Sequence, residues 1–219
     1  MALTISENQG DFEDLPEGKH NAVCYRIIDI GTHMELKFGS DTEYQKKHSV
    51  VFFWETTDAK MEDGRPYGVN RWYKLSLHEK STLYRDLDTW KGGITNEELA
   101  GLDLTKMLGV NCVLNIVHNN KGKAKVKAVH RLDDSVVPTV NESFAFDIDT
   151  YVSADNKEEV KKVALMSEYW VDKIETSLEV EAWKKKNPSK DEGDLESLKA
   201  IAEDGEVEDG GVTDKDIPF

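Results

Sequence analysis

An aromatic ring and a lysine share one face of a strand predicted at residues 69–77. The apolar residues there alternate with period two, so Val69 and Tyr73 face a core while Trp72 and Lys74 point outward. Unpaired nucleobases stack on such rings, and their phosphates bind neighbouring cations. The pattern therefore predicts a surface for single-stranded nucleic acid. The alternative is that the ring belongs to a hydrophobic core.

A second predicted strand, residues 123–132, carries a row of basic side chains outside its apolar positions. Such a row suits phosphate binding, but it also occurs on solvated edge strands, where it discourages aggregation. In a third predicted strand, residues 47–57, Phe53 shares its parity with Lys47 and Glu55, so we expect it to be exposed. Tyr25 and Arg26, in the strand before it, fit either face. The candidate residues for single-stranded DNA binding are Tyr25, Arg26, Lys47, Phe53, Arg71, Trp72, Tyr73, Lys74, Lys123, Lys125, Lys127 and Arg131.

Patterns for catalysis and metal binding do not occur in the sequence. There is no HExxH, GxSxG or P-loop motif, and His78-Glu79 has no recognisable partner. Cys24 and Cys112 have no ligand spacing and are expected to be small buried apolar residues. We therefore expect neither an enzyme nor a cofactor or metal site. The rival interpretation is a metal-dependent nuclease that uses the abundant carboxylates.

Strands dominate the segment that must position these residues. Period-two patterns and turn signals predict strands at 20–30 (continued to 38), 47–57, 69–77, 110–118 and 123–132, with a helix at 81–90 and a short turn at 96–100. A helix between the third and fourth of five strands is the layout of an OB-fold, a Greek-key barrel whose open face binds oligonucleotides. We predict a mainly β protein with a five-stranded OB-fold at residues 15–135.

Residues 136–190 are predicted to hold a connecting segment and one amphipathic helix at 155–186. Asp155 and Glu158 have the spacing of a capping box. The apolar stripe of this helix is expected to pack on the barrel, on a second copy in a homodimer, or in the groove of a partner. A shorter helix is predicted at 194–202. The stripe consists of Val160, Val163, Ala164, Trp170, Ile174, Leu178 and Ala182.

Charge is distributed unevenly along the chain. There are 43 acidic and 28 basic residues, which give a net charge of −15. Residues 1–18 hold five acids and no base, residues 19–132 hold 18 bases and 14 acids, and residues 133–219 hold ten bases and 24 acids. Only the strand-rich middle is positive, and local fields govern binding. We expect a flexible acidic arm at 1–14 and a disordered acidic tail at 191–219.

The chain ends in a short segment suited to docking on another protein. Two apolar side chains and a free carboxylate follow acidic residues, and a proline lowers the cost of ordering them. This tip consists of Asp214, Asp216, Ile217, Pro218 and Phe219. Residues 216–219 resemble the C-terminal tip of bacterial single-stranded DNA-binding proteins. The whole arrangement resembles single-stranded DNA-binding proteins encoded by bacteriophages, and residues 71–80 are similar to a segment that recurs in phage OB-fold proteins.

The resemblance implies an OB-fold that coats and protects single-stranded DNA in the cytoplasm of the bacterial host. It also implies a tail that recruits host or phage replication, recombination and repair proteins. Two features depart from the bacterial pattern. Lys215 interrupts the acidic run before the tip, which would weaken docking without abolishing it, because Asp214 and Asp216 remain. A helix follows the barrel in place of a low-complexity linker, which puts the bacterial tetramer in doubt. No membrane span or signal peptide is recognisable, so we expect no membrane partner.

Two other functions fit parts of this pattern. An acidic protein can mimic DNA and sequester a host nucleic-acid-binding protein, and the net charge of −15 favours this, whereas the basic row at 123–131 speaks against it. An annealing or recombination mediator on the same barrel would bind single strands and also promote pairing of complementary strands. If the protein binds single-stranded DNA, as a coating protein or as an annealing mediator, we expect the acidic tail to compete with DNA for the basic row.

Overall fold

The computed structural model describes residues 14–133, 137–154 and 156–187. Residues 1–13 of the acidic arm predicted at 1–14 lie outside these described residues, as do the short helix at 194–202, the acidic tail and Asp155 of the predicted capping box. The same holds for the whole predicted tip, which is Asp214, Asp216, Ile217, Pro218 and Phe219.

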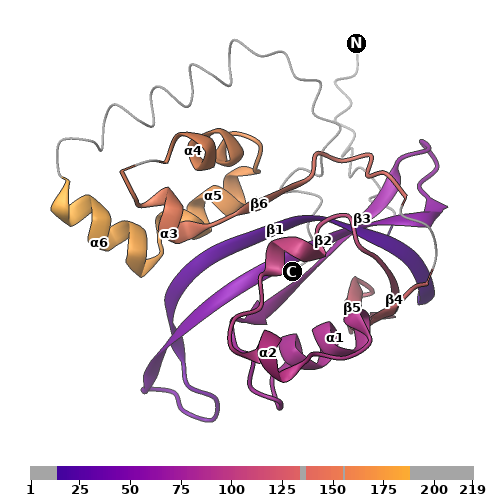
Figure 1. Ribbon diagram of the computed structural model, residues 1–219, viewed down its shortest axis with the longest axis horizontal. Coiled ribbons are helices and arrows are strands. Elements are labelled where there is room, and N and C mark those ends of the chain that lie inside the picture. Colours follow the sequence, from indigo (N-terminus) through magenta and orange to yellow (C-terminus); the bar gives the residue numbers. More distant parts are fainter. Residues whose placement is uncertain (1–13, 134–136, 155, 188–219) are drawn as a thin grey trace, which may run out of the picture.

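A six-stranded sheet forms the centre of the molecule (Figure 1). Five strands are antiparallel neighbours in the order β3-β2-β1-β4-β5, and β6 pairs in parallel with β1. The hydrogen-bonded path is not closed, and β3 and β5 are its two ends. The prediction of a mainly β protein is confirmed, although β6 was not predicted. The strands are β1 (Gly18–Leu36), β2 (Tyr44–Lys60), β3 (Pro66–Lys74), β4 (Asn111–His118), β5 (Ala124–Arg131) and β6 (Phe144–Phe146).

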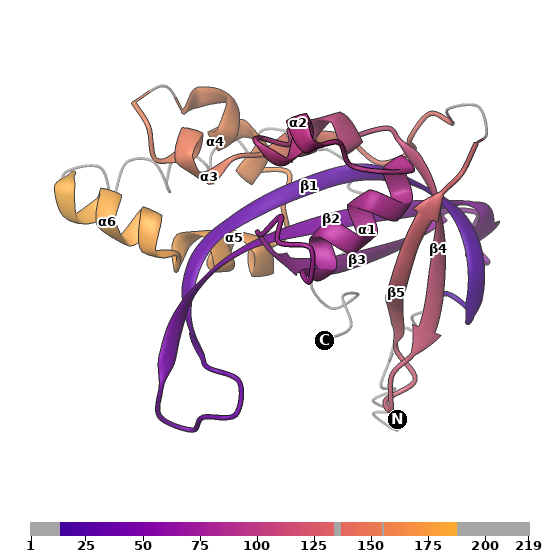
Figure 2. The same cartoon turned by 60° about the horizontal axis from the view of Figure 1, so that its bottom comes forward.

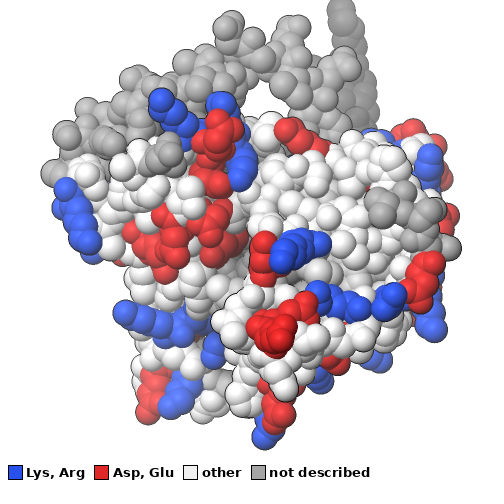
Figure 3. Space-filling view, viewed as in Figure 1, with Lys and Arg blue, Asp and Glu red and all other residues white. Residues whose placement is uncertain are grey.

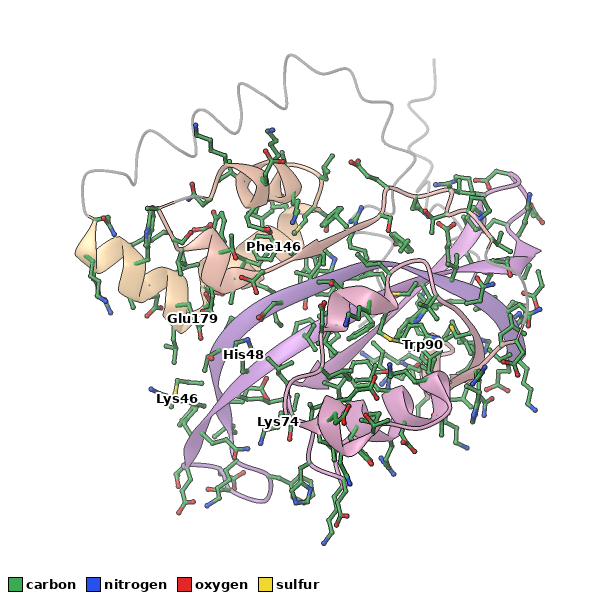
Figure 4. All side chains as sticks on the ribbon, viewed as in Figure 1. Lys46, His48, Lys74, Trp90, Phe146 and Glu179 are labelled. Atoms are coloured by element: carbon green, nitrogen blue, oxygen red, sulfur yellow. The ribbon has the colours of Figure 1, made fainter. Side chains whose placement is uncertain are left out.

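Helix α1 (Thr82–Lys91) closes a hydrophobic core on one face of the sheet. The helix begins where the Ser81 hydroxyl accepts a hydrogen bond from the backbone N–H of Tyr84, and it ends at Gly92 in the left-handed conformation. Trp90 packs 5.9 Å, centroid to centroid, from Trp54 of β2, and Figure 4 shows it between the helix and the sheet. Two short helices, α2 (Asn96–Leu99) and η1 (Leu104–Met107), precede β4. Cys24 and Cys112 are both buried in this core, as expected.

A second hydrophobic core covers the opposite face of β1 and β2. Four helices and β6 lie over that face, on the other side of the sheet from α1 (Figures 1 and 2). Trp170, Ile174 and Val163 of the predicted stripe are buried there. The stripe therefore packs on the sheet of its own chain, which is the first of the predicted alternatives. The helices are α3 (Ile148–Tyr151), α4 (Lys157–Val163), α5 (Glu168–Glu175) and α6 (Leu178–Lys186).

The prediction of one continuous helix at 155–186 is wrong. Three helices fill that segment, and Ser167 and Ser177 are the N-cap residues of α5 and α6. The Ser177 hydroxyl accepts a hydrogen bond from the backbone N–H of Val180. In a continuous helix this N–H would instead donate to a backbone carbonyl of the preceding turn. With these two breaks, side chains from all three helices reach the second core, namely Val163, Trp170, Ile174 and Val180.

The start of α6 is fixed on a bulge of β1. Gly31 lies in this bulge with φ of +75°, and a Cβ atom there would stand 2.7–2.8 Å from side chains of Ile148, Ser177 and Glu179. The Glu179 carboxylate accepts a hydrogen bond from the backbone N–H of Thr32 at 2.8 Å. Only glycine combines this backbone conformation with such a close approach.

Candidate nucleic-acid interface

Trp72 lies on the outer face of β3, as predicted. It is paired in the ladder with Val51 of β2, whose side chain enters the second core. The indole is 39% exposed, and its ring centroid lies 5.4 Å from that of the buried Trp170 on α5. The ring is thus held by packing against Trp170 and remains partly accessible to solvent.

Two lysines continue the outer face from Trp72 toward the β1–β2 turn. Lys74 is exposed and lies opposite Ser49 in the ladder. Lys47 precedes Ser49 by two residues on β2, so Lys47 and Lys74 both lie on the same face as Trp72. Lys47 forms an ion pair with Glu35 at 2.9 Å. Lys74 has no ion pair among the residues that the structure describes. The outer face of β2–β3 therefore brings together three of the predicted site residues, Trp72, Lys74 and Lys47.

Arg71 and Tyr73 lie on the inner face of β3, against α1, so their prediction as DNA contacts needs correction. The guanidinium of Arg71 lies 2.9 Å from the Asp86 carboxylate, and the Tyr73 hydroxyl donates to the same carboxylate at 2.7 Å. Burial raises the pKa of both Asp86 and Tyr73. These groups tie β3 to α1. They are next to Trp72 in sequence, but strand alternation directs them to the opposite face.

The prediction that Phe53 is exposed is wrong. Phe53 is 6% exposed, and its ring packs edge-on against Trp170 at 5.0 Å. Tyr25 is also buried, and burial raises its pKa to about 12. The guanidinium of Arg26 lies 4.5 Å from the ring centroid of Phe144 on β6. The C-terminal helices and β6 cover the face where these residues point, so Phe53 and Tyr25 belong to the second core.

The basic row on β5 is present but interrupted. Lys125 and Lys127 are exposed and have no ion pair within the described ranges. Lys123 lies 3.1 Å from the carboxylate of Asp14. Lys127 is the extra residue of a β-bulge, because Ile116 pairs with Val126 and Asn115 with Ala128.

Beyond that bulge the predicted alternation is shifted, so Val129 is buried in place of Ala128. Arg131 is exposed and forms an ion pair with Asp133. It also lies so close to Gly92 that a Cβ atom there would stand 2.7 Å from its guanidinium. Along the sheet, three strands separate this row from Trp72.

A protruding arm at the β1–β2 turn holds exposed residues that the sequence analysis did not select. Met34, Leu36 and Tyr44 are about half exposed or more, and Phe38 is fully exposed at the turn. Figure 2 shows this hairpin extending away from the body of the molecule. Lys46 lies beside Met34 in the ladder and is also exposed (Figure 4). The alternation of polar and apolar residues at 32–36 was the signal in the sequence that could have indicated these exposed positions.

A second group of polar contacts lies at the base of this arm. The imidazole of His48 lies 2.6 Å from the Asp29 carboxylate, which also accepts from the backbone N–H of Gly31. Figure 4 places His48 near Glu179. The hydrogen bond to Asp29 raises the pKa of His48, and the charges of Glu179 and Asp149 add to the effect.

The visible surface has no single field of one sign. Figure 3 shows acidic side chains gathered over the C-terminal helices, while lysines and arginines are interspersed with acids elsewhere. No group of three or more potential metal ligands occurs in the part of the chain that the structure describes. No described helix is long and apolar enough to cross a membrane.

Neither a known family model nor a curated protein matches this chain.

Proposed function

We propose that this protein binds single-stranded DNA without sequence specificity and has no catalytic activity. The observation that carries the proposal is the accessible indole of Trp72 beside Lys74, on the outer face of β3. A ring that is held on one side and partly exposed suits stacking of an unpaired base. Lys74, two residues further along the strand, suits binding of the adjoining phosphate. Neither contact depends on the identity of the base.

The arrangement of strands supports a five-stranded OB-fold for residues 15–135. The order β3-β2-β1-β4-β5 and the placement of α1 between β3 and β4 agree with that fold. An OB-fold binds oligonucleotides on the face of its second and third strands and with the loops joining strands 1–2 and 4–5. In this chain these correspond to Trp72 and Lys74, to the exposed β1–β2 arm, and to the β4–β5 hairpin with Lys125 and Lys127.

The biological role that we propose follows from the resemblance of the sequence to phage single-stranded DNA-binding proteins. The protein would coat and protect single-stranded DNA during phage replication, recombination or repair in the cytoplasm of the bacterial host. The tip at residues 214–219 would recruit the enzymes of those processes. This role is supported by the side chains of the tip, because its apolar residues can fill a pocket on a partner and its acidic residues can pair with basic residues around that pocket.

Titration of a fluorescently labelled oligo(dT) with the full chain, followed by anisotropy at several salt concentrations, tests the binding function. A duplex of the same length is the control. We expect binding of the single strand, much weaker binding of the duplex and an affinity that falls steeply with salt. Failure to bind either DNA would contradict the proposal and favour the acidic DNA mimic. Accelerated pairing of complementary strands would identify an annealing factor.

A further inference from the structure

Helix α5 places a second aromatic ring close to Trp72. Tyr169 is partly exposed, and its ring centroid lies 4.9 Å from that of Trp170 in an edge-on arrangement. Trp170 in turn lies 5.4 Å from Trp72. The centroids of Trp72 and Tyr169 therefore lie no further apart than the sum of these two distances. Trp170 is 2% exposed, so both of the more exposed rings contact the same buried ring.

The same helix supplies a cation at this position. Lys173 follows Tyr169 by one helical turn, and its ammonium lies 5.5 Å from the centroid of the Tyr169 ring. Lys173 is partly exposed and forms no ion pair with any residue that the structure describes. Glu175 on this helix forms an ion pair with Lys184 at 2.8 Å, whereas Glu168 and Asp172 are exposed and have no ion pair among the residues that the structure describes. Helix α5 therefore also carries an aromatic ring and a lysine on its surface, as β3 does with Trp72 and Lys74.

We infer that α5 extends the DNA-binding surface beyond the sheet. Tyr169 offers a second stacking position for a base next to the one on Trp72, and Lys173 contacts the phosphate between or beside them. Trp170 acts as a positioning residue that sets the spacing of the two rings. This inference rests on the proposed function, and it assigns to the C-terminal helices a part in binding besides covering the sheet.

Packing alone gives a different expectation for these residues. If Tyr169 only covers the rim of the second core, its removal lowers the stability of the fold and leaves the affinity of the folded protein for DNA unchanged. If Lys173 is only a solvated surface charge, its removal leaves the salt dependence of binding unchanged. The affinity and the salt slope therefore separate a binding role from a structural one.

The test uses the full chain and labelled oligo(dT), with Tyr169→Leu, Tyr169→Phe and Lys173→Gln compared with the unsubstituted protein. Tyr169→Leu should lower the affinity roughly fivefold or more, whereas Tyr169→Phe keeps a ring and should bind within about twofold of the unsubstituted protein. Lys173→Gln should reduce the slope of log affinity against log salt by about 0.7, the value for one phosphate contact on a single strand. Lys157→Gln is the matched control, because Lys157 is an exposed lysine of α4 without an ion pair in the described region.

A folded Tyr169→Leu protein with unchanged affinity overturns the inference, whatever the result for Lys173. If Tyr169→Leu does not fold, an unchanged salt slope in Lys173→Gln overturns it. Trp72→Ala separates the role of α5 from the binding function as a whole. Weaker binding by Trp72→Ala together with unchanged binding by both α5 variants would refute only the role of α5. Absence of binding by the unsubstituted chain would instead refute the proposed function.

Discussion

Side chains of β3 divide between two tasks according to the direction in which they point. Trp72 and Lys74 lie on the outer face, where they are accessible, while Arg71 and Tyr73 contact Asp86 of α1. The inner contacts fix the strand and thereby fix the orientation of the outer side chains. A binding surface on β3 thus depends on buried polar contacts that touch no ligand themselves.

Replacement of Trp72 by alanine should weaken binding of oligo(dT) by about 1–3 kcal/mol, because the stacking contribution of one base is lost. Trp72→Phe keeps a smaller ring and should recover part of the affinity. Anisotropy titrations measure both effects, and unfolding curves show whether each variant is folded. A folded Trp72→Ala protein with unchanged affinity would mean that Trp72 has only a packing role.

His48 should make the stability of the fold depend on pH. The hydrogen bond to Asp29 raises its pKa in the folded state above the ordinary value of 6.5, and Glu179 and Asp149 are the other acidic groups that act on it. The protonated imidazole therefore stabilises the fold below the pKa of the unfolded chain. This contribution is lost as the pH rises through the folded-state pKa.

Urea unfolding of the unsubstituted protein and of His48→Gln measures this effect. The difference in the free energy of unfolding between the two proteins should be larger at about pH 5.5 than at about pH 9. The other histidines titrate in both proteins, so their contributions cancel in the difference between the two free energies of unfolding. An equal difference at both pH values would show that the pair of His48 and Asp29 does not contribute to stability through its charge.

At the scale of the elements, two layers of helices cover opposite faces of one sheet. Helix α1 covers the inner face, and the C-terminal helices cover the outer face of β1 and β2. β3 lies at the end of the hydrogen-bonded path, next to β2, and keeps its outer face partly open at Trp72. The outer layer therefore decides which aromatic side chains of the sheet remain accessible.

The contact between the outer layer and β1 can be tested at Gly31. Gly31→Ala should lower the free energy of unfolding by about 2–5 kcal/mol, because it combines left-handed backbone strain with overpacking against Ile148 and Glu179. Gly39 has a similar φ of +79° but no atom within 4 Å of a Cβ position, so Gly39→Ala should cost only about 1–2 kcal/mol. Equal losses in the two variants would contradict the close packing of α3 and α6 on β1.

The order of strands and the orientation of Trp72 were predictable because they depend on local alternation and turn signals. The burial of Phe53 depends on a second layer distant in sequence, which a single strand does not reveal. The run of five apolar residues at 50–54 was a signal for burial on both faces. The breaks of the C-terminal helix at Ser167 and Ser177 were not found because the apolar period continues across them. The continuation of the first strand toward residue 38 was predicted, but the exposed residues of the arm were not selected because nothing in a single strand shows that its apolar residues lack a partner layer.

At the scale of the whole molecule, a net charge of −15 is combined with a small basic and aromatic surface. From Asp191 to the end of the chain there are eleven acidic residues against Lys199 and Lys215. Such a segment can compete with DNA for lysines through charge alone. The competition would be strong at low salt and screened at high salt.

Removal of residues 191–219 should therefore raise the affinity for oligo(dT) at low salt and have little effect at high salt. A shorter deletion of residues 214–219 retains most of the acidic residues and should change the affinity much less. Anisotropy titrations of the three proteins measure these differences. No gain at low salt would show that the tail does not compete with DNA, and it would leave the recruitment of partners by the tip unaffected.

Photocrosslinking to oligo(dT) that carries bromodeoxyuridine tests most directly whether single-stranded DNA lies on the outer face of β3. Tryptic digestion isolates residues 72–74 as one peptide, because Arg71 precedes it and Lys74 ends it. We predict that mass spectrometry finds a nucleotide adduct on this peptide, located on Trp72, and that unlabelled oligo(dT) suppresses it. Adducts found only on peptides from other faces, or no adduct at all, would contradict the account.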